Sequence, residues 1–290
     1  MAHWAAADRR GSAIEMTGRQ SSLGGLLGVL IVYCAGPVAA EPSDLVDRSA
    51  LKVCADPNNL PFSDDKKEGF ENKIAELIGA ELGRSVDYTW FPQVVGFVRN
   101  TLQAHLCDLV IGTVAGDEIM QTTNPYYYTT YVIVYRSDKG FSIEDLDDPR
   151  LKTLRLGVVG GTPPSDLLVR HDLMSHTKPY ALAVDTRAQS PTHEMVQDVV
   201  DDTIDAGFLW GPIAGYYRQH DALPLALVPL KSEPGAARMD YHIAMGVRAN
   251  EPEWRRRVNA AIVKRQAEIS VILRDYGVPL LDEQGDLTNP

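Results

Sequence analysis

The sequence predicts an α/β protein of two lobes, each built on a mainly parallel sheet flanked by helices. Between residues 51 and 112, three short apolar segments alternate with two segments of helical periodicity. Strands connected through helices pair in parallel, because each crossover helix returns the chain to the same end of the sheet. Residues 154–220 repeat this alternation, and another apolar segment follows at 242–247. A second α/β lobe inserted into the first accounts for this order.

The first block contains one clear amphipathic helix between short strands. Phe70, Ile74 and Ile78 lie at helical spacing, and Gly83 ends that helix. Short apolar or alternating segments before and after the helix predict strands. The elements expected in this block are a strand at 51–55, a helix at 70–82, a strand at 86–91, a helix at 96–104 and a strand at 107–112.

The second block is longer and ends in a long helix. Trp254, Val258 and Leu273 lie on one face of that helix, and Gly277 ends it. The elements expected are strands at 154–159, 180–184, 206–210 and 242–247, and helices at 165–173, 192–201, 212–220 and 251–276.

Strands near 132–136 and 242–247 border the second block, so the chain is expected to cross twice between the lobes. We therefore assign residues 41–136 and 242–290 to lobe 1 and residues 137–241 to an inserted lobe 2.

Residues 1–40 have the order of a secretory signal peptide. Arginines provide positive charge, residues 23–35 are almost wholly apolar, and two alanines precede Glu41. The apolar segment is too short to remain as an anchor across ~30 Å of hydrocarbon. We expect cleavage after Ala40 and a soluble periplasmic protein.

The charge balance excludes some classes of partner. There are 28 Lys and Arg residues against 39 Asp and Glu residues, a net charge of −11. This balance disfavours nucleic acid and anionic membranes. The negative charge serves either solubility or the encounter with a basic partner, and we expect a monomer.

Cys54 and Cys107 are the cysteines that follow the expected leader. Paired thiols in an oxidising compartment often form a disulfide. The expected strands place Cys54 late in one strand and Cys107 early in its neighbour, where their Cα atoms can lie farther apart than the ~7 Å that a disulfide tolerates. The sequence leaves open whether these cysteines are bonded or free.

The sequence has no metal-ligand spacing and no nucleophile elbow, so no metal, cofactor or catalytic residue is expected.

Several motifs resemble those of amino-acid-type periplasmic solute-binding proteins, in the same order, over residues 49–280. They are LKVCADPNNLPF at 51–62, CDLVIG at 107–112, NPYY at 124–127, GVVGGT at 157–162 and DAGFLWGPIAGYY at 205–217. The resemblance implies the two-lobed periplasmic binding protein fold of type II, with a ligand cleft between its lobes.

Two departures separate this sequence from the amino-acid binders. In that group an arginine soon after the third strand binds the ligand carboxylate, but residues 112–135 contain no Arg or Lys. An aspartate that usually meets the ligand ammonium is replaced by Trp210. A bound amino acid would keep unpaired charges, so we expect none to bind.

The altered motifs resemble the J accessory proteins of methanol dehydrogenase operons (MxaJ/XoxJ). They include PNNLPFS at 57–63, YTWFPQ at 88–93, GFVRNTL at 96–102, WGPIAGYY at 210–217 and YGVPLL at 276–281. The resemblance implies a periplasmic helper, not an enzyme, that binds the large subunit of a methanol dehydrogenase. That dehydrogenase depends on pyrroloquinoline quinone (PQQ) and on calcium or a lanthanide, and the helper assists its maturation or activation. Two alternatives are a solute-binding protein of an ABC importer for a small uncharged or apolar ligand, and a dehydratase-like periplasmic enzyme.

The candidate cleft residues lie mostly near predicted strand ends, where ligands bind in open α/β sheets. Trp210 either packs the edge of lobe 2 or faces the cleft, and we favour the cleft because aromatic side chains dominate interfaces. Thr162 ends a Gly-Gly turn that is more typical of a structural turn than of a phosphate site. The full set expected at the cleft is Asn59, Phe62, Glu71, Asn72, Trp90, Phe91, Thr113, Tyr126, Tyr127, Tyr128, Thr162, Trp210 and Pro212.

N-terminal sequencing of the exported protein tests the expected leader. We expect the mature chain to begin near Glu41, because small residues precede that position. Retention of residues 23–35 in a membrane fraction would contradict this prediction.

Overall fold

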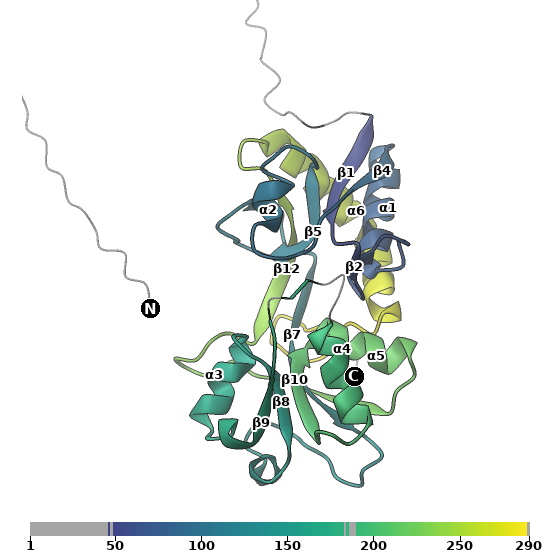
Figure 1. The fold of residues 1–290 in the computed structure, drawn as a ribbon. Coiled ribbons are helices and arrows are strands. Elements are labelled where there is room, and N and C mark those ends of the chain that lie inside the picture. Colours follow the sequence, from purple (N-terminus) through teal and green to yellow (C-terminus); the bar gives the residue numbers. More distant parts are fainter. Residues whose placement is uncertain (1–45, 47–48, 183, 186–189, 289–290) are drawn as a thin grey trace, which may run out of the picture. The chain divides into compact units, whose positions relative to one another are not determined.

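The computed structural model alternates strands and helices in two successive blocks (Figure 1). It describes residues 46, 49–182, 184–185 and 190–288. The expected leader and its cleavage point lie outside these residues. None of the helices in the described part of the chain is long and apolar enough to cross a membrane.

The strands are short apart from two. They are β1 Ala50–Ala55, β2 Asn58–Asn59, β3 Ser63–Asp64, β4 Ser85–Trp90, β5 Leu109–Val114, β6 Gln121–Thr122, β7 Tyr127–Arg136, β8 Leu156–Val159, β9 Thr177–Tyr180, β10 Ala206–Trp210, β11 Leu225–Pro229 and β12 Asp240–Val247. The helices are α1 Phe70–Leu82, α2 Phe97–Asn100, α3 Pro163–Arg170, α4 Pro191–Val200, α5 Gly211–His220 and α6 Pro252–Asp275, with 3-10 turns at Pro149–Lys152 and Met174–His176.

The main strands form one hydrogen-bonded path with the order β4-β1-β5-β12-β7-β10-β8-β9. The β4-β1-β5 pairs and the β10-β8-β9 pairs are parallel, as expected for strands joined by helices. β12 and β7, at the centre of the path, pair antiparallel with each other and with their outer neighbours β5 and β10. The two parallel groups are therefore connected through antiparallel strands.

β7 belongs to both groups of strands. Residues 127–130 pair with β12, whereas residues 131–135 pair with β10, and residues 132–136 pair also with β11. The change of partner falls between Thr130 and Tyr131, earlier than the lobe border that we placed at 136 on the apolar run alone.

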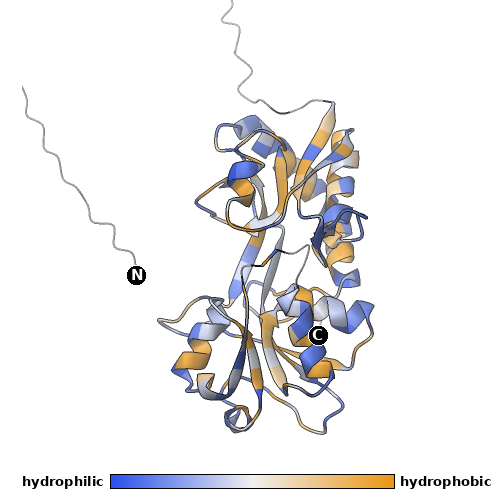
Figure 2. Ribbon diagram, in the orientation of Figure 1, coloured by the Kyte–Doolittle hydropathy of each residue, from blue (hydrophilic) through white to orange (hydrophobic). Residues whose placement is uncertain are grey.

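Each group of strands has its own apolar core. Phe70, Ile74, Trp254 and Leu273 come from α1 and α6 and are fully buried against the β1 group. The β8 and β10 group is covered on both faces, by cores that contain Val196 from α4 and Leu167 from α3. Figure 2 shows this pattern, with hydrophobic colour concentrated on the strands and alternating with hydrophilic colour along the helices.

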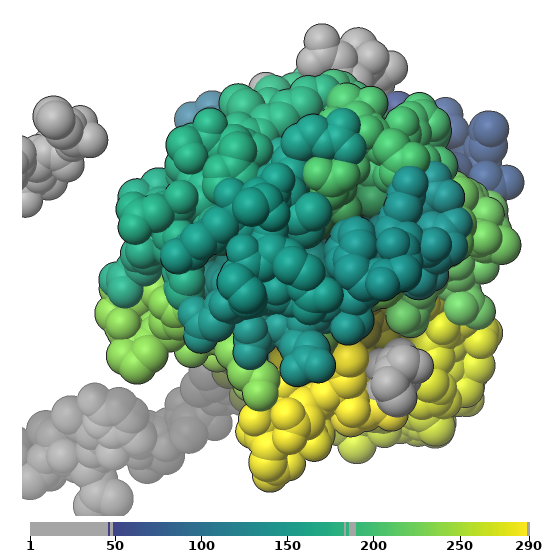
Figure 3. All heavy atoms as spheres, turned by 90° about the horizontal axis from the view of Figure 1, so that it is seen from below, coloured from purple at the N-terminus to yellow at the C-terminus, as the bar shows by residue number. Residues whose placement is uncertain are grey.

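The C-terminal segment packs on the second block (Figure 3). The hydroxyl of Thr129 donates a 2.6 Å hydrogen bond to the Pro279 carbonyl, and the amide of Leu281 donates one of 2.9 Å to the Tyr128 carbonyl. Gly215 of α5 lies so close to the backbone of Gly277 that a Cβ at either position would overlap the other. The tail is thereby fixed beside the junction in β7.

Several expected elements differ in extent, and one strand was not expected. The helix expected at 96–104 ends at Asn100, because Thr101 leaves helical geometry (φ −122°, ψ −80°) and His105 adopts a positive φ of 58°. The strand expected at 180–184 is β9, which ends at Tyr180 where its pairing with β8 ends. The edge strand β11 was not expected, because prolines flank it, and prolines are tolerated at sheet edges.

Cys54 and Cys107 form a disulfide with a Cα–Cα distance of 5.4 Å. The concern that the two strands hold these residues too far apart is therefore wrong. Cys107 does not lie within a strand: it precedes β5, which begins at Leu109, whereas Cys54 lies near the end of β1. The bond closes a loop over a sequence separation of 53 and lies in a small core with Phe97 and Leu102.

Removing this disulfide should destabilise the fold. Closing a loop of this length restricts the unfolded chain, so Cys54→Ser/Cys107→Ser should lower the free energy of unfolding by about 2–4 kcal/mol. Urea unfolding with and without reductant measures the change. Reductant should affect the parent protein and leave the double variant unchanged; equal sensitivity of both would contradict the prediction.

Candidate functional site

A cavity of about 550 Å³ lies between the two groups of strands. Its described walls come from both blocks and are mostly apolar or aromatic. They are formed by Phe62, Glu71, Gln93, Gly112, Thr113, Val114, Tyr127, Tyr131, Val159, Thr162, Pro163, Leu182, Thr192, Phe208, Leu209, Trp210, Ile213, Tyr241 and Ile243. A cavity of this size and character can hold a small organic molecule or a few side chains of a protein segment.

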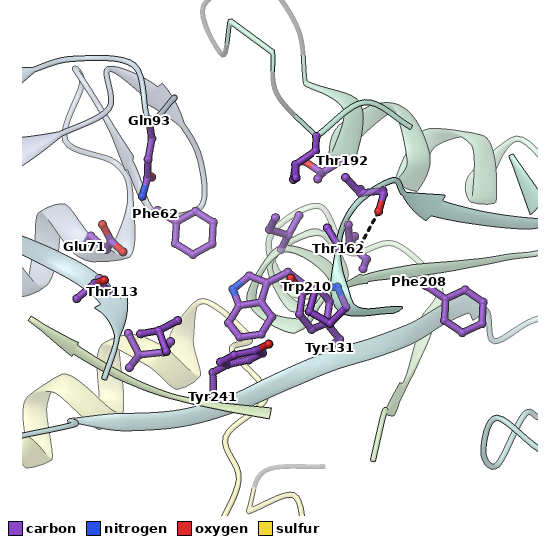
Figure 4. Close-up of a pocket in the computed structure, with 18 of the residues that line it drawn as sticks. Phe62, Glu71, Gln93, Thr113, Tyr131, Thr162, Thr192, Phe208, Trp210 and Tyr241 are labelled. Carbon is purple, nitrogen blue, oxygen red and sulfur yellow. Dashed lines mark hydrogen bonds between the residues drawn. The ribbon is translucent and has the colours of Figure 1, made fainter. Parts of the chain in front are cut away.

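The two walls differ in composition (Figure 4). Glu71 at the start of α1 and Thr113 in β5 lie on one side, with Phe62 beside them. Thr162 and Thr192 lie across the cavity, at the starts of α3 and α4. The hydroxyl of Thr162 donates a 2.6 Å hydrogen bond to the Val159 carbonyl, so this residue completes a structural turn before α3.

Three aromatic side chains form one continuous surface in the cavity. Trp210 is the last residue of β10 and pairs with Tyr131 of β7. Their ring centroids are 4.8 Å apart in a T-shaped arrangement. The centroid of the Trp210 ring is 5.9 Å from that of Tyr241, near the start of β12. We call Tyr131, Trp210 and Tyr241 the aromatic cluster. It lies where β7 changes partners, because all three residues flank that point.

Glu71 is the one carboxyl among the described residues that line the cavity, and none of those residues is a Lys or an Arg. It lies in the first turn of α1, and a Cβ added to Gly112 would overlap its carboxylate. Burial raises the pKa of Glu71 to about 8. Burial and the nearby Glu71 also raise the pKa of Tyr127 well above its ordinary value, so this phenol stays neutral. The glycine thus leaves room for a carboxyl group in an apolar wall.

The structure places six of the expected cleft residues on the cavity wall: Phe62, Glu71, Thr113, Tyr127, Thr162 and Trp210. Asn59 does not line the cavity, but its amide donates a 2.9 Å hydrogen bond to Gln93, which does.

The remaining expected residues have structural roles. The Asn72 side chain accepts hydrogen bonds from the amides of Asp64 and Gly69, and so fixes the start of α1. Tyr126 is buried and donates a 2.9 Å hydrogen bond to the Ile111 carbonyl. These two residues do not line the cavity, because neighbours of lining residues in the sequence point into the core instead.

Four aromatic or proline residues of the expected set also lie away from the cavity wall. Trp90 stacks on Tyr88 at 4.6 Å, and Phe91 packs on the core around the disulfide. Tyr128 lies on the opposite side of β7 from Tyr127; it stacks on His242 and donates a hydrogen bond to Asp240. Pro212 is buried in the first turn of α5.

Several lining residues were absent from the expected set, above all Tyr131 and Tyr241. The sequence did contain an indication of both residues, since each lies next to a point where the chain was expected to cross between the lobes. The alternation of β7 also places Tyr131 an even number of residues from Tyr127, on the same face. Phe208 borders the cavity, but its ring points away from it into the core (Figure 4).

Within the described residues, no cluster of three potential metal ligands occurs.

Comparison with known proteins agrees with the fold and the motifs. The family of bacterial extracellular solute-binding proteins, family 3, matches residues 51–277. MoxJ of Methylorubrum extorquens is 31% identical in an alignment of 257 residues that covers 84% of this chain and 84% of the relative. MoxJ of Paracoccus denitrificans is 28% identical over 263 residues, covering 85% of this chain and 95% of the relative.

A solved structure with the same fold is that of the periplasmic binding protein XoxJ from Methylobacterium extorquens AM1. It superposes with a TM-score of 0.69 at 41% identity, over 81% of this chain and all of that chain. The chain therefore belongs to the bacterial extracellular solute-binding proteins of family 3. Within that class it is a homologue of the MoxJ and XoxJ proteins. The expected type II binding-protein fold is confirmed.

The buried carboxyl of Glu71 predicts a distinctive pH dependence of stability. Folding raises its pKa from 4.5 to about 8. The contribution of this group to the free energy of unfolding is therefore fully present below pH 4.5 and is lost as the pH rises towards 8. Glu71→Gln should remove this loss. Between pH 6 and 9 the parent should lose about 2 kcal/mol more than the variant, measured by urea unfolding.

Glu76→Gln is the matched control, because Glu76 lies on the same helix but is exposed and paired with Lys67. This control should follow the parent protein across the pH range. Identical pH profiles for Glu71→Gln and the parent would contradict the raised pKa.

Proposed function

We propose that the chain is a periplasmic accessory protein of a PQQ-dependent methanol dehydrogenase, and that it binds the large subunit of that enzyme. Its cavity would receive a segment of the dehydrogenase during maturation or activation. In this proposal the chain is exported, acts as a monomer and has no catalytic role or cofactor of its own. The family match and the homology with MoxJ and XoxJ support the proposal.

The observation that carries the proposal is the composition of the cavity. Trp210 lies on its wall at the place where amino-acid binders are expected to carry an aspartate, and no Arg or Lys is among its described lining residues. A free amino acid would leave its carboxylate without a cationic partner there. The cavity therefore fits a ligand group other than a zwitterion.

The aromatic cluster supports a protein as the partner. Tyr131, Trp210 and Tyr241 are only partly buried, and they present ring surface to the cavity. Aromatic residues in a concave, largely desolvated site are typical binding hot spots, and the loss of one costs about 2 kcal/mol or more. Threonines and Gln93 add polar groups to the wall. Such a surface can anchor one or two side chains of a partner.

Trp210→Ala should weaken the binding of purified methanol dehydrogenase about thirtyfold, the equivalent of 2 kcal/mol. Surface plasmon resonance measures the affinity, and a thermal melt verifies that the variant folds. Trp90→Ala is the matched control, because Trp90 stacks on Tyr88 outside the cavity. This control should bind like the parent; equal loss in both variants, or none in either, would contradict a role for the cavity.

A further inference from the structure

We propose that the cavity binds an organic cation, an ammonium or guanidinium group on an apolar body, with the Glu71 carboxylate as its counter-ion. This inference deepens the proposed function and rests on its premise that the cavity is a binding site. It assigns a chemical class to the group that enters.

The position of Glu71 is the first observation. No described residue donates a hydrogen bond to its carboxylate or forms an ion pair with it, whereas the buried charged side chains of the described chain have partners. Arg248, for example, bonds both Asp108 and Glu251. A half-buried carboxyl on an apolar wall without a protein partner costs free energy, so its retention calls for an explanation. A cationic ligand group would provide the missing partner.

The neighbours of Glu71 leave space for such a group. Gly112 has no side chain, and the carboxylate of Glu71 lies where a Cβ would otherwise be. Phe62 and Thr113 flank the carboxylate on the cavity side (Figure 4). The carboxylate is therefore held at the wall and remains accessible from the cavity.

The aromatic walls are the second observation, and they favour a cation of organic type. The aromatic cluster lies across the cavity from Glu71, and Phe62 lies on the Glu71 side (Figure 4). Aromatic faces attract ammonium and guanidinium groups and also pack on apolar carbon. A small hydrated metal ion gains little from such walls, and no described cluster of oxygen ligands surrounds Glu71. An alkylammonium or arginine-like group can pair with the Glu71 carboxylate and also pack on the aromatic side chains.

Binding is coupled to a proton. Near neutral pH the carboxyl of Glu71 holds its proton, since burial raises its pKa to about 8. A bound cation stabilises the carboxylate, so the proton is released to solvent as the ligand enters. The other titratable groups that face Glu71 are the phenols of Tyr126 and Tyr127, which are buried and neutral. Affinity for a cation should therefore rise with pH by about tenfold per unit below pH 8.

Calorimetric titration of the parent protein with benzylammonium tests the inference. Three probes of similar shape serve as controls: benzyl alcohol is neutral, benzoate is anionic, and phenylalanine adds a carboxylate. We expect benzylammonium to bind at least tenfold more tightly than each of them, with release of a proton at pH 7 seen as a dependence on buffer ionisation enthalpy. Equal binding of benzyl alcohol, or no binding of benzylammonium at millimolar concentration, would overturn the proposal.

Variants locate the counter-ion. Glu71→Gln should weaken benzylammonium binding at least tenfold and remove the pH dependence, whereas Glu76→Gln should change neither. Gly112→Ala keeps the carboxyl group but forces it to move, so it should also weaken binding. Unchanged affinity in a folded Glu71→Gln protein would overturn the assignment. If Glu71→Gln fails to fold, proton release on benzylammonium binding to the parent protein is the deciding measurement, and its absence would overturn the assignment.

Two sources of the cation can be separated. A lysine side chain of the dehydrogenase is represented by lysine with both backbone ends blocked, and its titration should then compete with dehydrogenase binding. Binding of benzylammonium without such competition would support a free amine as the ligand. Because these titrations need no dehydrogenase, the cation inference can fail while the Trp210 test succeeds, and the reverse.

Discussion

The pairing of β7 with two different sets of strands is the constraint on which the site depends. Residues 127–130 of β7 bond to β12, and residues from 131 onward bond to β10. The hydroxyl of Thr130 lies within 3.0 Å of the carbonyls of Leu230 and Met239, so this junction is held on the side of the second block. Tyr131, Trp210 and Tyr241 all sit at this junction. Their positions follow from backbone pairing, and not from the packing of the aromatic side chains alone.

The same backbone geometry explains why one wall of the cavity accepts a carboxyl group. Glu71 is carried by the first turn of α1, where a negative charge is favoured by the helix dipole. That turn is positioned by Asn72, which bonds two backbone amides of the preceding loop. Gly112 then provides the space beside β5. Burial raises the pKa of Glu71, and the favourable dipole offsets only part of that cost.

Much of the fold could be predicted from the sequence because its strands and helices have strong periodicity. Helix α1 and strand β10 have the expected bounds, and both end at residues with a clear local signal. The pairing within β7 could not be predicted, since a single long strand gives no sign of where its partners change. The disulfide depended on the turn before β5, whose path is set by hydrogen bonds between distant segments, including that from the Asp108 amide to the Lys52 carbonyl.

The site was predicted less well than the fold, for a physical reason. Motif resemblance identifies a segment, whereas a cavity wall is made by alternate residues of that segment. In the run Tyr126–Tyr128, only Tyr127 reaches the cavity, while its neighbours bond to Ile111 and Asp240. Tyr131 and Tyr241 required knowledge of the junction. The motif placed Glu71 at the cleft, but only the structure showed that its carboxyl lies in an apolar wall. A carboxyl at a helix start is ordinary on a surface, and it becomes a selective group when it lines a mostly apolar cavity whose described lining contains no cation.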